Sequence, residues 1–390
     1  MVEAQVAVGM GLLVFVAAIL SVELGISVAL IEIVLGVIGG NFLGLHTTPW
    51  IDYLAGFGSI VLTFLAGAEV DVDLLREKLG ASALIGGVSF LLPFVGAWAF
   101  ARWGLRWSPE AAKIAGVALS TTSLAVVYAV LVETGLTSTP LGKLIMASTF
   151  ITDFGTAAAL SILFIHPTWW IAGFLAVSAA IIVAMPRLHP WFFRRYGNRV
   201  IEPEIKGAFA ALLVLMYVGS LADSHAVLPA FVLGLAVSRV FAAHRAEQQR
   251  FRVVAFALLT PFFFVKAGMN VALPAVYANL GVLAVLFGVK MATKVAGVLP
   301  LARWYAADGP IYTTLLMSTG LTFGTISSLY GLHAGIIDRT QFSLLVTTVI
   351  ASAVLPTMIA QRWFDPRRAA VARSRPEGAW QPVPTEEELG

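Results

Sequence analysis

Apolar residues fall into long runs along the chain, and short polar or glycine-containing segments separate them. A helix that crosses about 30 Å of hydrocarbon needs roughly 20 mostly apolar residues. About thirteen runs approach or meet this length, near residues 5–22, 26–45, 52–69, 82–104, 111–133, 140–164, 168–187, 207–223, 226–241, 252–272, 277–302, 310–330 and 340–361. The pattern predicts an all-α polytopic membrane protein with about thirteen transmembrane helices.

The composition excludes several classes of protein. Hydrophobic residues make up 59% of the 390 residues and charged residues 12%, whereas soluble domains carry about 25% charged residues. A soluble enzyme and a nucleic-acid binder are therefore excluded, and the basic residues lie at membrane edges. The absence of cysteine removes thiolate catalysis and disulfides. We expect a transporter in the lipid bilayer, not an enzyme, with no cofactor and no nucleic-acid partner.

The basic residues predict the orientation in the membrane. Eighteen of them lie in connections on one side and four on the other, and positive residues concentrate on the cytoplasmic side. This distribution places the N-terminus outside and the C-terminus in the cytoplasm, in the cell inner membrane. The segment before the first run contains Glu3 and no Lys or Arg, whereas a signal peptide begins with positive charge. The first run is therefore not interpreted as a cleaved signal peptide.

Two parts of the chain resemble each other. Residues 119–123 are similar to residues 317–321, and residues 148–153 are similar to residues 347–352, which end at Ser352. The fifth and twelfth spans, which contain the first pair, run in opposite directions in this topology. Inverted repeats of this kind are typical of secondary transporters. The alternative is that small and hydroxyl residues recur in any helix bundle because they permit close packing.

Asp153 is a carboxylate predicted at membrane depth, where ionisable groups are costly and indicate function. Thr149, Thr152 and Thr156 share its helical face. Hydroxyl and carboxylate oxygens are the ligands that a dehydrated alkali cation prefers, and no other metal is expected. The alternative is an aspartate that neighbouring hydroxyls satisfy as a packing device.

Two spans contain polar runs that predict interrupted helices. Hydroxyl side chains compete for backbone hydrogen bonds, and glycine weakens a helix. The residues concerned are Ser120, Thr121, Thr122 and Ser123 in the fifth span, and Ser318, Thr319, Gly320 and Thr322 in the twelfth. Interrupted backbone at membrane depth is tolerated where protein or a water-filled cavity satisfies it. Ordinary small-residue packing is the alternative.

Four further ionisable residues lie inside predicted spans. Lys290 and Lys294 are one turn apart on the same helical face, so one or both could compensate interrupted helix ends or pair with a carboxylate. Their depth does not distinguish them. Lys266 lies in the outer half of its span and is expected to snorkel to the surface more readily. Glu32 is a secondary candidate that lines a cavity or pairs with a buried lysine.

These motifs together resemble a known family. Ile151-Thr152-Asp153, after a Ser-Thr-Thr-Ser span, is similar to the core of monovalent cation:proton antiporters, and most similar to their Kef/Nap-type branch. The resemblance covers about residues 5–362. Further matching motifs are Phe64–Asp71, Pro261–Phe264 with Gly268-Met269, Lys290–Gly297, Ser318–Thr322 and Ile350–Pro356.

The resemblance implies a homodimer with two crossed discontinuous helices, a dimerisation half and a core that moves like an elevator. The implied divisions are dimerisation helices in 1–81 and 207–274, core helices in 82–164 and 275–362, a linker helix with a basic cytoplasmic loop in 165–206, and a disordered cytoplasmic tail in 363–390. The family's essential aspartate falls on Asp153, and its buried basic residue matches Lys294 best. Relatives often carry a second acidic or amide residue where this chain has Thr152, which leaves the stoichiometry open.

The resulting hypothesis is exchange of Na⁺ or K⁺ for H⁺, with Asp153 binding either ion in turn. Thr121, Thr122, Thr149 and Thr152 are expected to complete the cation shell. A sodium-coupled symporter of an organic anion is the main alternative, and it requires an anion site for which Lys266 and Lys294 are the candidates. A channel needs no titrating carboxylate, and an intramembrane aspartyl protease needs two aspartates at depth.

Overall fold

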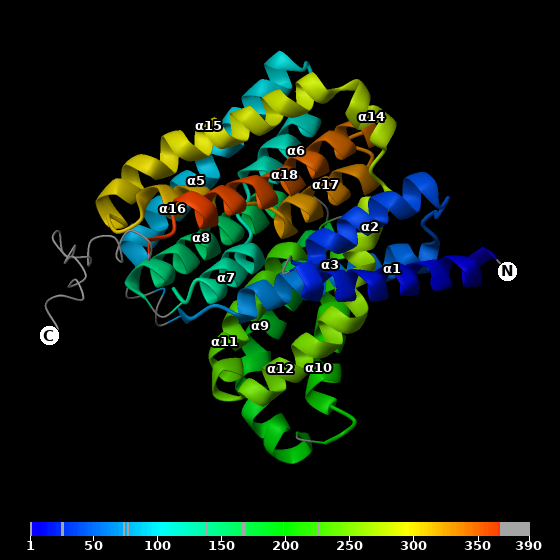
Figure 1. Cartoon of the computed structure of the whole chain (residues 1–390). Coiled ribbons are helices and arrows are strands. Elements are labelled where there is room, and N and C mark those ends of the chain that lie inside the picture. The colour runs from blue at the N-terminus through cyan, green and yellow to red at the C-terminus, as the bar shows by residue number, and fades with distance from the viewer. Residues whose placement is uncertain are drawn as a thin grey trace, which may run out of the picture.

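The computed structural model describes residues 2–366, apart from Gly25, Ile26, Asp73, Leu74, Arg76, Glu77, Ser138, residues 165–168, Asn198, Asp223 and His225. Within this part the protein is helical (Figure 1). The helices are α1 (Val2–Leu24), α2 (Val28–Phe42), α3 (Pro49–Ala68), α5 (Leu79–Ala99), α6 (Pro109–Ser120), α7 (Leu124–Glu133), α8 (Pro140–Leu163), α9 (Trp169–Tyr196), α10 (Pro203–Leu221), α11 (Val227–Ala243), α12 (Arg245–Val254), α13 (Thr260–Met269), α14 (Leu273–Ala278), α15 (Leu280–Tyr305), α16 (Pro310–Met317), α17 (Thr322–His333) and α18 (Arg339–Trp363). Short π-helical turns extend α5 to Gly104 and join α12 to α13.

The predicted number of membrane crossings is confirmed. Ten helical stretches in the described chain are long and apolar enough to cross a membrane, with α6–α7 and α12–α13 each forming one stretch. Two shorter apolar helices, α2 and α11, and the interrupted pair α16–α17 bring the total in the described residues to thirteen. The protein is therefore a multi-pass membrane protein.

Local sequence signals fix where several helices begin. Proline occupies the first turn of α3, α6, α8, α10 and α16, where its missing N–H has no helical partner to lose. The hydroxyls of Ser108 and Thr139 each accept a 3.1 Å hydrogen bond from a backbone N–H of the helix that follows. Asp338 and Gln341 form a capping box at the start of α18.

The helices form two groups. The core bundle consists of α5–α8 and α15–α18, and the flanking bundle of α1–α3 and α9–α13. In Figure 1 the core bundle fills the upper part of the view, α1–α3 lie beside it, and α9–α12 extend below. Helix α8 of the core bundle packs against α11 of the flanking bundle. The dimerisation and movement that the resemblance implies for these groups stay predictions.

A close helix crossing holds the flanking bundle together. Helices α3 and α11 approach so closely that a β-carbon on Gly67 would collide with the carbonyl oxygen of Phe231. A β-carbon on Gly234 would likewise collide with the carbonyl oxygen of Phe64. Small residues allow backbones in a membrane to approach in this way and gain van der Waals contact. The crossing fixes the position of Phe231, whose ring points away from this contact toward the core bundle.

One predicted boundary is far from the observed one. The seventh span was expected to end at residue 187, before a basic loop, but α9 continues to Tyr196. Arg187, Arg194 and Arg195 therefore lie on a helix. The last turns persist because His189 and Phe193 stack on each other and Phe193 packs on His244 at the end of α11. The predicted disordered tail lies outside the described residues beyond Pro366.

Candidate ion and proton site

The first predicted interruption is present between α6 and α7. Helix α6 ends at Ser120 because Thr121 adopts an extended backbone conformation, with φ −64° and ψ 151°. The hydroxyls of Ser120 and Thr121 donate to the carbonyls of Val117 and Ala118, at 2.9 and 3.1 Å. These bonds satisfy backbone acceptors that the helix leaves without an N–H partner. The hydroxyl run thus ends the helix and also caps it.

The second interruption separates α16 from α17 at residues 318–321. The hydroxyl of Ser318 donates to the Thr314 carbonyl at 2.7 Å, and that of Thr319 donates to the Leu316 carbonyl at 2.8 Å. Gly320 lies against the first interruption: a β-carbon there would lie 2.5 Å from Lys290 Nζ and 2.7 Å from Thr121 Oγ1. A side chain at this position would therefore displace the Lys290 ammonium and the Thr121 hydroxyl.

The two interruptions are in direct contact. The hydroxyl of Thr122 donates to the carbonyl of Met317, the last residue of α16, at 2.9 Å. The backbone N–H of Ser123 donates to the Thr319 hydroxyl at 3.5 Å. The predicted pair of crossed discontinuous helices is therefore confirmed. Ser352 of α18 lies beside the same place, since its hydroxyl is 3.3 Å from the β-carbon position of Gly320.

Both buried lysines of α15 contact the interruptions, each through its own set of partners. Lys290 and Lys294 are fully buried. Lys290 Nζ donates to the Thr121 carbonyl, just past the end of α6, at 3.4 Å. Lys294 Nζ donates to the hydroxyls of Ser89 and Thr122 at 2.8 and 3.0 Å, and both hydroxyls donate in turn to the Met317 carbonyl at the end of α16. Both lysines therefore lie beside C-terminal ends of the interrupted helices, where partial negative charge accumulates.

Asp153 lies on α8 and is only 2% exposed. Its Oδ1 is buried and has no hydrogen-bond partner among the described residues. The neighbouring hydroxyls do not satisfy it, because each donates to a backbone carbonyl: Thr149 to Ile145, Thr152 to Gly86 and Ser148, and Thr156 to Thr152. The interpretation of Asp153 as an aspartate that these hydroxyls satisfy is therefore unsupported.

The surroundings of Asp153 contain both oxygen atoms and positive charge. Lys294 lies near enough for its charge to act on Asp153, but the two groups form no direct ion pair in the described structure. Thr149 also contacts Met317, with 3.5 Å between its hydroxyl and the sulfur, so the threonine face of α8 adjoins the second interruption. Hard oxygen ligands with one negative charge are the chemistry that an alkali cation requires.

Two cavities open on opposite parts of the interface between the bundles. One, of about 520 Å³, is lined by Phe150 of α8 and by residues at the end of α3 and on α12. The other, of about 380 Å³, is lined by Leu160 of α8, Phe263 and residues of α17. At 1.5 Å per helical residue, Asp153 lies about 4.5 Å along α8 from Phe150 and about 10 Å from Leu160. Asp153 is thus between the cavities and nearer to the larger one.

Aromatic rings pack together beside Asp153. Phe231 of α11 is fully buried. Its ring centroid lies 5.3 Å from that of Phe150, 6.0 Å from that of Phe154 and 6.1 Å from that of Phe323. Phe150 and Phe154 flank Asp153 on α8, and Phe323 belongs to α17. These rings therefore join α8, α11 and α17 at the level of Asp153.

Glu69 lines the larger cavity at the end of α3 and forms an ion pair with Arg252 of α12, with 3.3 Å between the charged atoms. Burial raises the pKa of the Glu69 carboxyl above its ordinary value, and the Arg252 guanidinium partly opposes this shift. An acidic group with a raised pKa therefore lines the larger cavity.

Two of the predicted site residues, Lys266 and Glu32, lie in the flanking bundle. Lys266 does not snorkel to the surface as expected: it is 1% exposed, and its Nζ lies 2.7 Å from a carboxylate oxygen of Asp52 on α3. Glu32 is buried on α2, and it forms no ion pair with a lysine among the described residues. Sequence reasoning missed Asp52 and Ser89. Each is a single polar residue in or at the edge of an apolar run, which is a weak signal.

Crossed interrupted helices from inverted repeats, with a buried carboxylate between two cavities, define a secondary transporter. The sequence model of the family described as sodium/hydrogen exchanger, transmembrane, matches residues 11–364, and the chain belongs to this family.

Several known proteins can be aligned with this chain over most of their length. A probable Na⁺/H⁺ antiporter 3 of Methanocaldococcus jannaschii is 24% identical over 356 residues, which cover 87% of this chain and 89% of that protein. The Na⁺/H⁺-K⁺ antiporter GerN of Bacillus cereus is 25% identical over 375 residues, covering 91% and 95%. The fold is similar to that of the sodium proton antiporter MjNhaP1 of M. jannaschii, with a TM-score of 0.69 at 14% identity, covering 93% and 99%.

Proposed function

We propose that this protein exchanges Na⁺ for H⁺ across the cell inner membrane and that Asp153 binds either ion, one at a time. The observation that carries the proposal is the buried Asp153 Oδ1, which lacks a hydrogen-bond partner among the described residues and lies between two cavities. Family membership and the relatives named as Na⁺/H⁺ antiporters support it.

The coordination shell follows from the residues around the carboxylate. The hydroxyls of Thr149 and Thr152 donate their protons to backbone carbonyls, so their oxygen lone pairs stay available to a cation. Thr121 and Thr122, with carbonyls of the interruption between α6 and α7, provide further oxygen ligands. When the cation leaves, a proton takes its place on Asp153.

Exchange is obligatory because moving the Asp153 carboxylate without a bound cation or proton costs too much free energy. A bare carboxylate costs several kcal/mol in a low-dielectric barrier. When Asp153 carries Na⁺ or H⁺, the site is neutralised and the core bundle can move relative to the flanking bundle. This elevator-type movement passes the site from one cavity to the other, and an empty, charged site does not make the passage.

The lysines set the stoichiometry that we propose. Lys294 donates hydrogen bonds to two hydroxyls and Lys290 donates one to a carbonyl, and we propose that both side chains carry the charged ammonium form. Both lysines then keep their protons through the cycle and balance the interrupted helices. With Asp153 as the single titrating group, one Na⁺ is exchanged for one H⁺ and no net charge moves.

The proposal also includes the orientation in the membrane, a homodimer and a second candidate substrate. The positive-inside rule favours an N-terminus outside and a C-terminus in the cytoplasm, so the larger cavity, beside the Arg-rich α12, faces the cytoplasm. The flanking bundle provides the surface for a homodimer, as the resemblance implies. K⁺ is a second candidate substrate, because the name of the relative GerN includes K⁺.

The symporter of an organic anion is less well supported than exchange. Its two candidate anion ligands already have partners, since Lys266 pairs with Asp52 and Lys294 donates to Ser89 and Thr122. An anion at either lysine would have to displace those contacts.

The test uses the purified protein in liposomes with an imposed pH gradient and a fluorescent pH probe. Na⁺, Li⁺, K⁺ and choline are added in turn to wild type, to Asp153→Asn and to Glu110→Gln. Glu110 is a surface carboxylate that pairs with Lys113. We expect Na⁺ to collapse the gradient in wild type and Glu110→Gln but not in Asp153→Asn. Retained exchange in Asp153→Asn, or no collapse with any cation across a range of pH, would overturn the proposal.

A further inference from the structure

We propose that the last turns of α9 form a binding site for the headgroup of an anionic phospholipid. The site is the α9 basic face, defined here as Arg187, Trp191, Arg194 and Arg195 with the adjoining residues 199–201. This site is separate from Asp153, and it is independent of the proposed exchange.

The four residues of the helix share one side of it. Their spacing of i, i+4, i+7 and i+8 places them on a single helical face, and all four are exposed. His189 and Phe193 lie on the opposite side of α9, where they pack on α11 and α12. The α9 basic face therefore points away from the protein, toward the surrounding lipid or water.

The length of α9 places this face at the edge of the hydrocarbon. Its 28 residues span about 42 Å at 1.5 Å per residue, whereas the hydrocarbon is about 30 Å thick. At its start, Trp169 and Trp170 are 97% and 58% exposed, as residues of an interfacial aromatic belt are. The last eight residues or so then extend beyond the hydrocarbon, so Arg194 and Arg195 reach the depth of lipid phosphates.

The chemistry of the face matches an anionic lipid. None of Arg187, Arg194, Arg195, Arg199 and Lys206 has a carboxylate partner among the described residues, and the bonds of Arg187 and Arg194 are to backbone carbonyls. Beside these cations, Trp191, Val200 and Ile201 are 56%, 100% and 63% exposed. Cations next to exposed apolar side chains suit a phosphate above acyl chains, and free phosphate would leave the apolar part uncovered.

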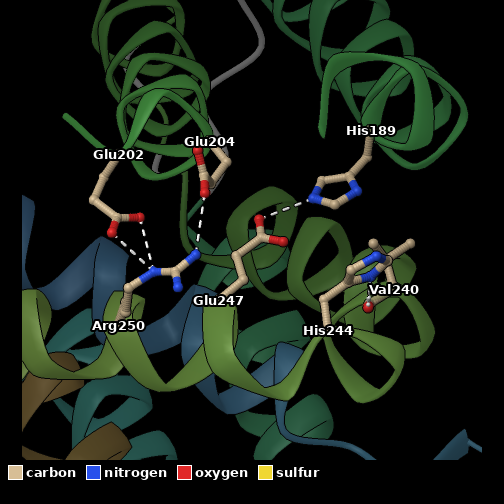
Figure 2. A network of polar contacts seen from close by, with 7 residues as sticks. All are labelled: His189, Glu202, Glu204, Val240, His244, Glu247 and Arg250. Atoms are coloured by element: carbon tan, nitrogen blue, oxygen red, sulfur yellow. Dashed lines mark hydrogen bonds and ion pairs between the residues drawn. The ribbon is translucent and has the colours of Figure 1, made fainter. Parts of the chain in front are cut away.

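Polar contacts fasten this site to α12 (Figure 2). His189 Nε2 lies 2.9 Å from an oxygen of Glu247 on α12. Arg250, also on α12, reaches Glu202 at 2.9 Å and Glu204 at 3.2 Å at the start of α10. Another face of α12 lines the larger cavity through Arg245, Gln248, Gln249 and Arg252. A lipid bound at the α9 basic face therefore stabilises a packed unit that includes a wall of that cavity.

The test measures thermal unfolding of the purified full-length protein in a neutral detergent. Short-chain phosphatidylglycerol, short-chain phosphatidylcholine and inorganic phosphate are titrated separately. We expect phosphatidylglycerol alone to raise the unfolding midpoint of wild type. In Arg194→Gln/Arg195→Gln the concentration needed should rise about fivefold for each arginine removed, because a basic residue near an anionic surface contributes about 1 kcal/mol.

A matched control removes two charges elsewhere on the same side. Lys143→Gln/Arg303→Gln changes residues at the start of α8 and the end of α15, where Arg303 also has exposed aromatic neighbours. This variant should respond to phosphatidylglycerol as wild type does. An equal loss in both double variants, an equal effect of phosphatidylcholine, or an equal effect of inorganic phosphate would overturn the proposal. None of these readouts depends on transport.

Discussion

Thr122 and Met317 join the two interrupted helices: the Thr122 hydroxyl donates to the Met317 carbonyl at 2.9 Å and accepts from Lys294 Nζ at 3.0 Å. One side chain thus connects the end of α16, the gap between α6 and α7, and a buried lysine. Valine has nearly the same shape as threonine but offers no hydrogen bond. Replacing Thr122 by valine therefore tests the connection with little change in packing.

For Thr122→Val we expect a loss of about 1–3 kcal/mol in the free energy of unfolding, because a buried acceptor and a buried ammonium each lose a partner. Apparent Na⁺ affinity should fall as well, since Thr122 is a proposed ligand. Thr348→Val is the control, because the Thr348 hydroxyl is equally buried but bonds only within α18. Equal stability of the two variants would contradict the prediction.

Gly320→Ala should damage the site. The added β-carbon would lie 2.5 Å from Lys290 Nζ and 2.7 Å from Thr121 Oγ1, so both side chains would have to move and the hydrogen bond from Lys290 to the Thr121 carbonyl would be disturbed. We expect lower thermal stability and a severe loss of exchange in liposomes.

Gly288→Ala is a matched control on α15, because its β-carbon would meet nothing within 4 Å. In that variant the helix gains up to about 1 kcal/mol from the better helix propensity of alanine. Exchange should be unchanged. If Gly320→Ala behaved like Gly288→Ala, the close approach of the interruptions would be unimportant for transport.

Phe231→Ala should open a leak between the cavities. Removing the ring takes away the contacts with Phe150, Phe154 and Phe323, which we expect to act as a barrier at the level of Asp153. We expect a pH gradient across liposomes to decay without added cation, faster than in wild type. The substitution also costs about 3–5 kcal/mol of stability, so Phe231→Leu, which keeps more volume, is measured beside it.

The control for the leak is Phe241→Ala. Phe241 lies on the same helix and is equally buried, but its ring packs on Phe64 and Phe251, away from the cavities. It should lose stability without a leak. A leak of the same size in Phe241→Ala would indicate general loosening instead of a barrier at Phe231.

Glu69 should affect the pH dependence of cation uptake. Because burial raises its pKa, Glu69 becomes protonated nearer to neutral pH than an ordinary glutamate as the pH falls. Arg252 then loses its partner, the larger cavity becomes more positive, and the local Na⁺ concentration decreases. Glu69→Gln should therefore show the weak apparent Na⁺ affinity of the acidic state at all pH values. The check is apparent Na⁺ affinity against pH, and identical profiles would refute the role.

The sequence predicts the fold well because membrane spans and helix interruptions are local properties. Hydropathy defines the thirteen crossings, and the hydroxyl run at 120–123 ends α6 where expected. The predicted end of α9 was wrong because prolines and arginines usually end an apolar helix. Here contacts of His189 and Phe193 with distant segments keep the last turns helical.

Partners distant in sequence were not predictable from one chain. Lys266 finds Asp52 more than two hundred residues away, and Ser89 joins Lys294 from another span. Lys290 and Lys294 are equivalent by helical periodicity, and only the three-dimensional arrangement shows that Lys290 contacts the Thr121 carbonyl and Lys294 the Thr122 hydroxyl. Periodicity gives the face of a residue but not which helix lies against that face.

The central claim is that one carboxylate binds either Na⁺ or H⁺. The most direct measurement is proton release from the purified protein in weakly buffered detergent solution when NaCl is added, with choline chloride as the control. We predict that each bound Na⁺ releases one proton in wild type and that Asp153→Asn releases none. Sodium binding without proton release, or unchanged release in Asp153→Asn, would contradict the account.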